Sequence, residues 1–196
     1  MQNKFRWTYL TGLFMILALP ILILPPYFFP ADWGKTLIFR SIMAILLFLF
    51  AWQTLSRKDE VLLPDLKKSK ITWALSALFI VYLLASIFSI DANFSFWGSP
   101  YRGGGFVDFA FYFIFTFLAF ILFTKKDWQK AWIFSIFTGL LVSLIAVIQY
   151  YGLFNRIFLS TPTRPPSTMG NPIILAIYLL LLLFNSLSLG IKENKI

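Results

Sequence analysis

Apolar residues along this 196-residue chain gather into six long runs, separated by short polar segments. The runs cover residues 8–29, 36–55, 71–90, 106–124, 132–153 and 172–190. About 20 mostly apolar residues are enough for a helix to cross the hydrocarbon core of a bilayer. Backbone groups cannot be left unpaired in hydrocarbon, so runs of this length are expected to be helical. The pattern therefore predicts an all-α, polytopic transmembrane helical bundle of about six spans, with residues 1–196 forming a single transmembrane domain.

The composition supports lipid as the solvent of this chain. Hydrophobic residues make up 59% of it and charged residues 13%, which exceeds what a soluble domain of this size can bury. The first run follows Lys4 and Arg6, as in a signal peptide, but it is long, contains Pro20 and lacks a small-residue cleavage site. We therefore interpret it as a retained span.

The distribution of basic residues predicts the orientation of the spans. With a cytoplasmic N-terminus, twelve basic residues fall in cytoplasmic segments: Lys4, Arg6, Arg57, Lys58, Lys67, Lys68, Lys70, Lys125, Lys126, Lys130, Lys192 and Lys195. Four fall in outer segments: Lys35, Arg102, Arg156 and Arg164. All seven tryptophans lie near predicted span ends, as in the aromatic belt of a membrane protein. Both termini are therefore expected in the cytoplasm.

The net charge of +9 is explained by this topology and by attraction to anionic inner-leaflet lipid. We therefore expect the lipid bilayer as a partner and no nucleic acid. The sequence contains no His and no Cys, which excludes a zinc site and a Ser-His or Cys-His nucleophile within this chain. No metal and no cofactor is expected.

The polar connections show where a site could be built. On the cytoplasmic side, the sequence KKDWQK at 125–130 is interpreted as a tight polar turn. On the outer side, segments 91–105 and 154–171 are longer and rich in Pro, Gly, Ser and Thr. Any extracytoplasmic site is expected to come mainly from those two segments.

Two charged residues fall inside predicted spans near their outer ends, Arg40 and Asp108. A charge within a span is costly and usually faces a partner or a water-filled cavity. We therefore expect Arg40 and Asp108 to form a pair or to share one polar pocket. The alternative is that Arg40 extends its guanidinium outward to the bilayer surface.

Arg102 stands in FWGSPYRGGGF, residues 96–106, among glycines and aromatic residues. Glycines allow close approach of the backbone to a ligand, and a guanidinium suits bidentate phosphate binding. The segment would suit an amphipathic ligand that carries phosphate. The alternative is an interfacial turn whose arginine meets lipid headgroups.

The second outer cluster is TPTRPPSTMGNP, residues 161–172, in which Arg164 is the candidate for binding. Asn171 followed by Pro172 is typical of a helix start, with Asn171 as cap and Pro172 in the first turn of the last span. The N-terminus of that helix would favour an anion. Capping alone would also explain Asn171.

The segments DANFSFWGSPYRGGGF, KKDW and RPPSTMGNPIILAIYLLLLL, in this order, resemble the N-terminal half of bacterial O-antigen ligase and polymerase family membrane proteins. The resemblance covers most of the chain, from the second span to the end. It implies a multi-pass enzyme of the bacterial inner membrane that transfers or polymerises a glycan from an undecaprenyl diphosphate carrier on the outer face. It implies no metal or nucleotide cofactor.

In this family, arginines hold the diphosphate leaving group and a periplasmic histidine activates the acceptor. The resemblance carries the first role to Arg164, Arg102 and Arg40, and the shaping of the entrance to the last span to Gly170 and Asn171. Family members usually have around a dozen spans and a loop bearing the histidine, which this sequence does not contain. We therefore expect this chain to need a further segment or a second membrane subunit for activity, with the catalytic residues unknown.

Two other functions stay open from the sequence. A transporter for a small or lipid-linked molecule would use the charges of Arg40 and Asp108, together with prolines that interrupt the first span. A non-catalytic membrane scaffold would explain the missing histidine and the few acidic residues, eight in the whole chain.

Overall fold

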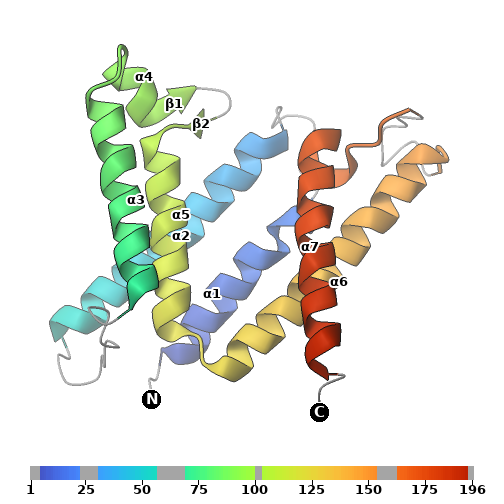
Figure 1. The fold of residues 1–196 in the computed structure, drawn as a ribbon, viewed down its shortest axis with the longest axis horizontal. Helices are drawn as coiled ribbons and strands as arrows, with labels where there is room; N and C mark the ends of the chain where they lie inside the picture. Colours follow the sequence, from blue (N-terminus) through green and yellow to red (C-terminus); the bar gives the residue numbers. More distant parts are fainter. Residues whose placement is uncertain (1–4, 23–30, 57–68, 100–102, 154–162, 194–196) are drawn as a thin grey trace. The chain divides into compact units, whose positions relative to one another are not determined.

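The computed structural model describes residues 5–22, 31–56, 69–99, 103–153 and 163–193. These residues are almost entirely helical (Figure 1). In chain order the elements are α1 (Arg6–Ala18), the short 3-10 helix η1 (Leu19–Ile21), α2 (Ala31–Ser56), α3 (Lys70–Ile87), α4 (Ala92–Trp97), β1 (Gly98–Ser99), β2 (Gly103–Gly104), α5 (Phe106–Leu122), α6 (Lys125–Tyr150), the 3-10 helix η3 (Ser167–Met169) and α7 (Pro172–Glu193). The predicted all-α class is confirmed.

Four of these helices are long and apolar enough to cross a membrane: Gly34–Ser56, Lys70–Ile87, Lys125–Tyr150 and Pro172–Ile191. Two shorter apolar helices, Arg6–Ile21 and Phe106–Leu122, fall on the remaining predicted runs. Many large apolar side chains on these helices are exposed, as expected where lipid is the solvent. The helices therefore indicate a multi-pass membrane protein.

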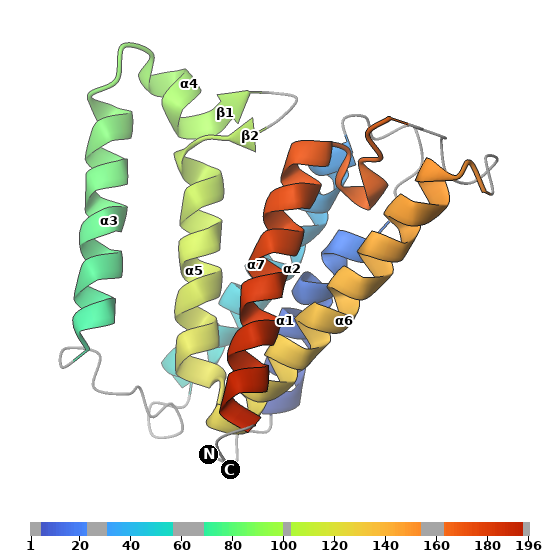
Figure 2. The ribbon, with the colours of Figure 1, turned by 45° about the vertical axis from the view of Figure 1, so that its right-hand side comes forward.

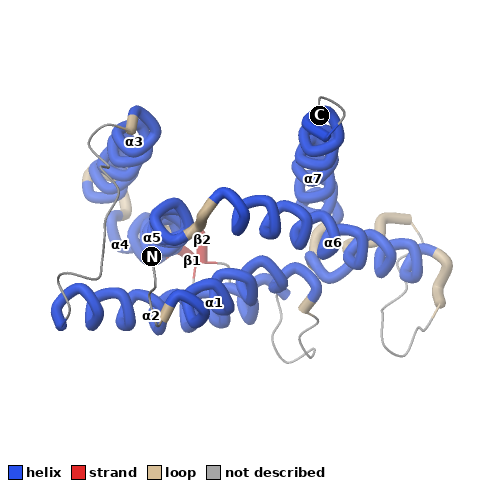
Figure 3. Tube along the Cα trace, turned by 90° about the horizontal axis from the view of Figure 1, so that it is seen from below, coloured by secondary structure: helices blue, strands red, loops and turns tan. Residues whose placement is uncertain are grey.

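Several helix boundaries differ from the predicted runs. The first run is helical only to Ile21, and its residues 23–30 lie outside the described part of the chain. The third run stops at Ile87 rather than 90, because the chain turns there and Asp91 caps α4. Helix α4 and the two short strands, which Figure 3 shows in red, were not predicted.

The prediction of a polar turn at 125–130 is wrong, because those residues form the first turns of α6. Thr124 and Asp127 form a capping box at the start of this helix. The Thr124 amide donates to Asp127 Oδ2 over 2.8 Å, and the Asp127 amide donates to Thr124 Oγ1 over 3.4 Å. Both residues thus satisfy amide groups that a helix start otherwise leaves unpaired.

The chain divides into two compact units. Unit 1 comprises Met1–Leu13 and Thr36–Phe123, and unit 2 comprises Phe14–Lys35 and Thr124–Ile196. Helices α1 and α2 each contribute one part to each unit. The single transmembrane domain expected over residues 1–196 stays a prediction.

In unit 1, aromatic side chains hold α5 to its neighbours. Figure 2 shows α3 beside α5, with α4 and the two strands at one end of the pair. Phe79 of α3 lies 4.7 Å from Phe113 between ring centroids, and Tyr82 stacks on Phe109 at 4.3 Å. From α2, Phe39 stacks on Tyr112 at 5.0 Å. The aromatic residues of this unit therefore place α2 and α3 against α5.

In unit 2, α6 packs against α7 and η3 around a small apolar core of Val142, Met169 and Leu175. The two helices meet closely at Gly139, since a Cβ there would lie 2.1 Å from a methyl carbon of Leu182. Through η3, this packing holds the described residues just before α7 against α6. These residues, from 163 on, belong to the second predicted cluster.

Candidate functional site

A glycine hairpin precedes α5 in unit 1. Strand β1 pairs antiparallel with β2, with Gly98 opposite Gly104 and Ser99 opposite Gly103. Gly98 and Gly104 have φ angles of 77° and 84°, which side-chain-bearing residues rarely adopt. The glycines at these two positions are therefore required by the backbone of the hairpin.

Gly105 is required for a different reason, the close approach of two backbone segments. A Cβ at this position would lie 2.3 Å from the amide nitrogen of Gly98 and 2.6 Å from the carbonyl oxygen of Phe96. Both are backbone atoms, so a side chain at this position would require the chain itself to shift. The run of glycines that was predicted to approach a ligand thus first serves to close the chain on itself.

Asp108, in the first turn of α5, joins this hairpin to α2. Its Oδ2 accepts a hydrogen bond of 2.7 Å from the amide of Gly104. Its Oδ1 accepts from Arg40, at 2.8 Å from Nε and 2.6 Å from Nη2. The Asp108 side chain is 6% exposed and that of Arg40 is 30% exposed. Both carboxylate oxygens are therefore used, and the position near a helix N-terminus further favours the negative charge.

The expected pairing of Arg40 with Asp108 is confirmed. The sequence left an outward-extended Arg40 open as the alternative, and the ion pair decides against it. Asp108 occupies the edge of the guanidinium formed by Nε and Nη2, while part of the Arg40 side chain stays accessible. Arg102 belongs to the connection between Ser99 and Gly103 and lies outside the described residues.

The second predicted cluster lies in unit 2, before α7. Arg164 is exposed. Gly170 follows η3 in the left-handed conformation, with φ 71°. The side-chain oxygen of Asn171 accepts a 2.8 Å hydrogen bond from the amide of Ile173. The prediction of Asn171 as a helix cap is confirmed, whereas a role of Arg164, Gly170 or Asn171 in binding stays a prediction.

Sequence reasoning missed the polar contacts that fix this segment. Gln149 of α6 binds the backbone of Ser167 twice, since its Oε1 accepts from the Ser167 amide at 2.7 Å and its Nε2 donates to the Ser167 carbonyl at 3.3 Å. The hydroxyl of Ser167 donates to the carbonyl of Val142 at 2.6 Å. Ser167 has a φ angle of 53°, rare for a residue with a side chain. The sequence feature that could have indicated these contacts is Gln149 itself, a polar residue near the end of an apolar run.

Lys35 supplies a further link in unit 2. Its ammonium group donates to the carbonyl oxygens of Pro20 and Thr168, and the hydroxyl of Thr168 donates to the same carbonyl of Pro20. Pro20 lies in η1, where the α-helical hydrogen-bond pattern ends and carbonyl groups become available. Lys35 was assigned only as an outer-segment charge, and the structure shows it holding η1 to η3.

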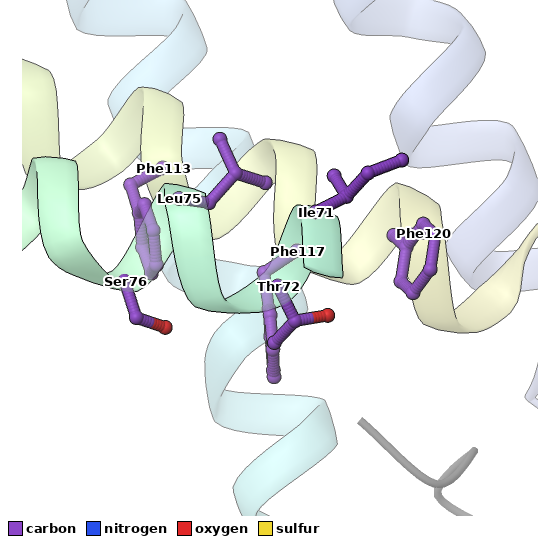
Figure 4. Close-up of a pocket in the computed structure, with 7 residues that line it drawn as sticks. All are labelled: Ile71, Thr72, Leu75, Ser76, Phe113, Phe117 and Phe120. Atoms are coloured by element: carbon purple, nitrogen blue, oxygen red, sulfur yellow. The ribbon is translucent and has the colours of Figure 1, made fainter. Parts of the chain in front are cut away.

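An apolar groove lies between α3 and α5 in unit 1 (Figure 4). It is lined by Ile71, Thr72, Leu75, Ser76, Phe113, Phe117 and Phe120. From Asp108 to Phe117, at about 1.5 Å per helical residue, the distance along α5 is about 14 Å. The groove therefore lies along the same helix as the Arg40–Asp108 pair, toward its C-terminal end.

The chemistry of these sites is that of guanidinium groups and backbone amides. Among the described residues, no group of three or more His, Cys, Asp or Glu side chains could hold a metal ion. Comparisons with protein-family models, curated proteins and solved structures find no match to this chain. The resemblance to the O-antigen ligase and polymerase family stays a prediction from the sequence motifs.

Proposed function

We propose that this chain is part of a membrane glycosyltransferase that transfers or polymerises a glycan from an undecaprenyl diphosphate carrier at the outer face of the bacterial inner membrane. The observation that carries the proposal is the position of Arg40, which Asp108 holds at the base of a glycine hairpin in a helical membrane protein. The chain's part in the reaction would be to bind the diphosphate of the carrier.

The carrier combines a strongly anionic group with a long hydrocarbon tail. An arginine suits the diphosphate because its planar guanidinium donates several hydrogen bonds and stays protonated. Asp108 orients Arg40 without covering it, since the Arg40 side chain remains 30% exposed. Exposed apolar side chains of α3, which is long and apolar enough to cross a membrane, offer hydrocarbon contacts in the same unit. Both parts of such a ligand would thus meet suitable groups in unit 1.

Arg102 and Arg164 are further candidates for phosphate binding, as the family resemblance implies. Arg102 lies in the hairpin connection, and Arg164 is exposed before the N-terminus of α7. The two hydrogen bonds from the Gln149 side chain to the Ser167 backbone would hold the residues just before α7 in one conformation. Gly170 and Asn171 would shape the start of α7.

During transfer, negative charge develops on the leaving diphosphate. Positioned arginines would stabilise that charge, which is the part of catalysis this chain can supply. Activation of the acceptor requires a base, and the sequence has no histidine for that role. We therefore assign that role to a group outside this chain.

The experiment is equilibrium binding of radiolabelled undecaprenyl diphosphate to the full chain in nanodiscs, with undecaprenol as the ligand lacking phosphate. We expect binding of the diphosphate, weaker binding of undecaprenol, and loss of diphosphate binding in Arg40→Gln and Arg164→Ala. Lys126→Ala is the matched control, because Lys126 is an exposed basic residue at the start of α6. Equal binding of the two lipids, or unchanged binding in both arginine variants, would overturn the proposal.

A further inference from the structure

Unit 1 exposes a group of apolar side chains between α3 and the hairpin. Phe88 is 83% exposed, Ile90 is fully exposed, and Phe94 and Trp97 are 57% and 61% exposed. We call these residues, Phe88, Ile90, Phe94 and Trp97, the corner group. Isolated exposed apolar residues are ordinary, but these four lie within ten residues and outside the long apolar helices.

The corner group belongs to a segment with a defined inner and outer side. Phe96 is directed toward α5, where its ring lies 5.5 Å from that of Phe106. Phe94 and Trp97 stand three residues apart on α4, which places them on one face of the helix. Helix α4 thus packs through Phe96 and presents an aromatic face away from its own unit.

Charge is almost absent from this segment. Asp91 is the one charged residue between 88 and 97, and its Oδ1 accepts a 2.9 Å hydrogen bond from the amide of Phe94 as the cap of α4. The segment also continues directly from α3, which is long and apolar enough to cross a membrane. The apolar surface of the span and that of the corner group therefore follow one another along the chain.

We propose that the corner group inserts into the lipid bilayer at the boundary between headgroups and acyl chains, so that α4 is an interfacial anchor. Exposed Phe, Ile and Trp with few charges are the side chains that bind at this depth. Gly98 directly follows Trp97 and begins the hairpin. The anchor thereby holds the hairpin, including its amide contact to Asp108, at the level of the lipid phosphates.

Insertion of the corner group is independent of the proposed glycan transfer, since it depends only on the surface of residues 88–97. It also explains why a short helix is placed between a span and a hairpin whose backbone is already closed by glycines. Without lipid contact, the aromatic face of α4 would be left in water.

The test uses site-directed spin labels, for which the chain is well suited because it contains no cysteine. Single substitutions Ile90→Cys and Phe94→Cys are made in the full chain and reconstituted in phosphatidylethanolamine–phosphatidylglycerol vesicles. Accessibility to oxygen, which concentrates in lipid, is compared with accessibility to a water-soluble nickel chelate. Asn93→Cys is the matched control, since Asn93 is the exposed polar neighbour of Phe94 on the same helix. Lys126→Cys gives the aqueous reference.

We expect labels at 90 and 94 to have a severalfold higher oxygen-to-nickel ratio than the label at 126, with the label at 93 between them. A ratio at 90 and 94 equal to that at 126 would show that the corner group faces water and would overturn the proposal. Low access to both reagents would show that a protein covers the group, which would overturn it as well. Equal ratios at 93 and 94 would rule out a face-specific anchor.

Discussion

Arg40 and Asp108 lie 68 residues apart in the sequence and share an ion pair of 2.6 Å between helices α2 and α5. The carboxylate also accepts the amide of Gly104, so one side chain joins a helix, a hairpin and a guanidinium. A buried carboxylate is tolerated only when its charge and its hydrogen bonds are both satisfied. The same ion pair therefore contributes to the stability of unit 1 and fixes the position of Arg40 within its span.

The pair predicts non-additive effects on stability. Asp108→Asn is expected to lower the free energy of unfolding by about 1 to 3 kcal/mol, because it removes the charge that Arg40 needs while leaving a buried polar group. Arg40→Gln is expected to have a similar effect. The double variant should be less destabilised than the sum of the two, by roughly 1 kcal/mol. Reversible unfolding in mixed detergent micelles measures the cycle, and additive effects would contradict the coupling.

Three glycine-to-alanine variants distinguish two reasons for a glycine in the hairpin, which are close contact with neighbouring backbone and a positive φ angle. Gly105→Ala places a Cβ against the backbone of Gly98 and should open the hairpin, at a cost of several kcal/mol. Gly104→Ala meets no neighbouring atom but has a φ angle of 84°, so about 1 to 2 kcal/mol is expected. Gly190→Ala meets nothing and lies within α7, where alanine should stabilise by up to about 1 kcal/mol.

Thermal unfolding in detergent, monitored by circular dichroism, ranks the three glycine variants. The expected order of melting temperature is Gly190→Ala above the parent protein, then Gly104→Ala, then Gly105→Ala. A melting temperature of Gly105→Ala equal to that of the parent would show that the hairpin is not closed as described.

The hydrogen bonds between Gln149 and Ser167 predict that loss of the Gln149 side chain lowers stability locally, in the residues just before α7. Gln149→Ala removes the acceptor of the buried Ser167 amide and should cost about 1 to 3 kcal/mol. Hydrogen exchange followed by mass spectrometry should show lost protection in peptides covering residues 163–171. Ser143→Ala is the control, because the exposed hydroxyl of Ser143 donates to the Leu140 carbonyl of its own helix. Equal protection in both variants would show that the segment is held by other contacts.

The helices could be predicted because hydropathy over about 20 residues is a property of the local sequence. The Arg40–Asp108 pair could be predicted for a physical reason as well, since two opposite charges at similar depth in lipid have few alternatives to pairing. Neither prediction required knowledge of the packing between helices. Both are accordingly found in the structure.

The remaining features depend on information that composition and periodicity do not carry. The hairpin depends on the φ angles of Gly98 and Gly104, and a Gly-rich stretch reads equally well as an open loop. The Gln149–Ser167 contact joins residues 18 apart that do not belong to one helix, so no periodic pattern in the sequence predicts it. The start of α6 did have a local signal, since Thr124 and Asp127 have the spacing of a capping box, but the charged residues around them favoured a turn.

The chemistry of Arg40 gives the prediction that bears most directly on function. Arg40→Lys keeps the positive charge and can still pair with Asp108, but it replaces a planar fork of donors by a single ammonium group. If Arg40 binds a diphosphate while Asp108 holds its Nε edge, the lysine variant should stay folded and bind undecaprenyl diphosphate about 10- to 100-fold more weakly, as for loss of a charge-assisted hydrogen bond. Binding in nanodiscs is measured beside the melting temperature of each variant. A lysine variant that binds as tightly as the parent would show that only charge is needed, whereas a fall in both binding and melting temperature would assign Arg40 to stability.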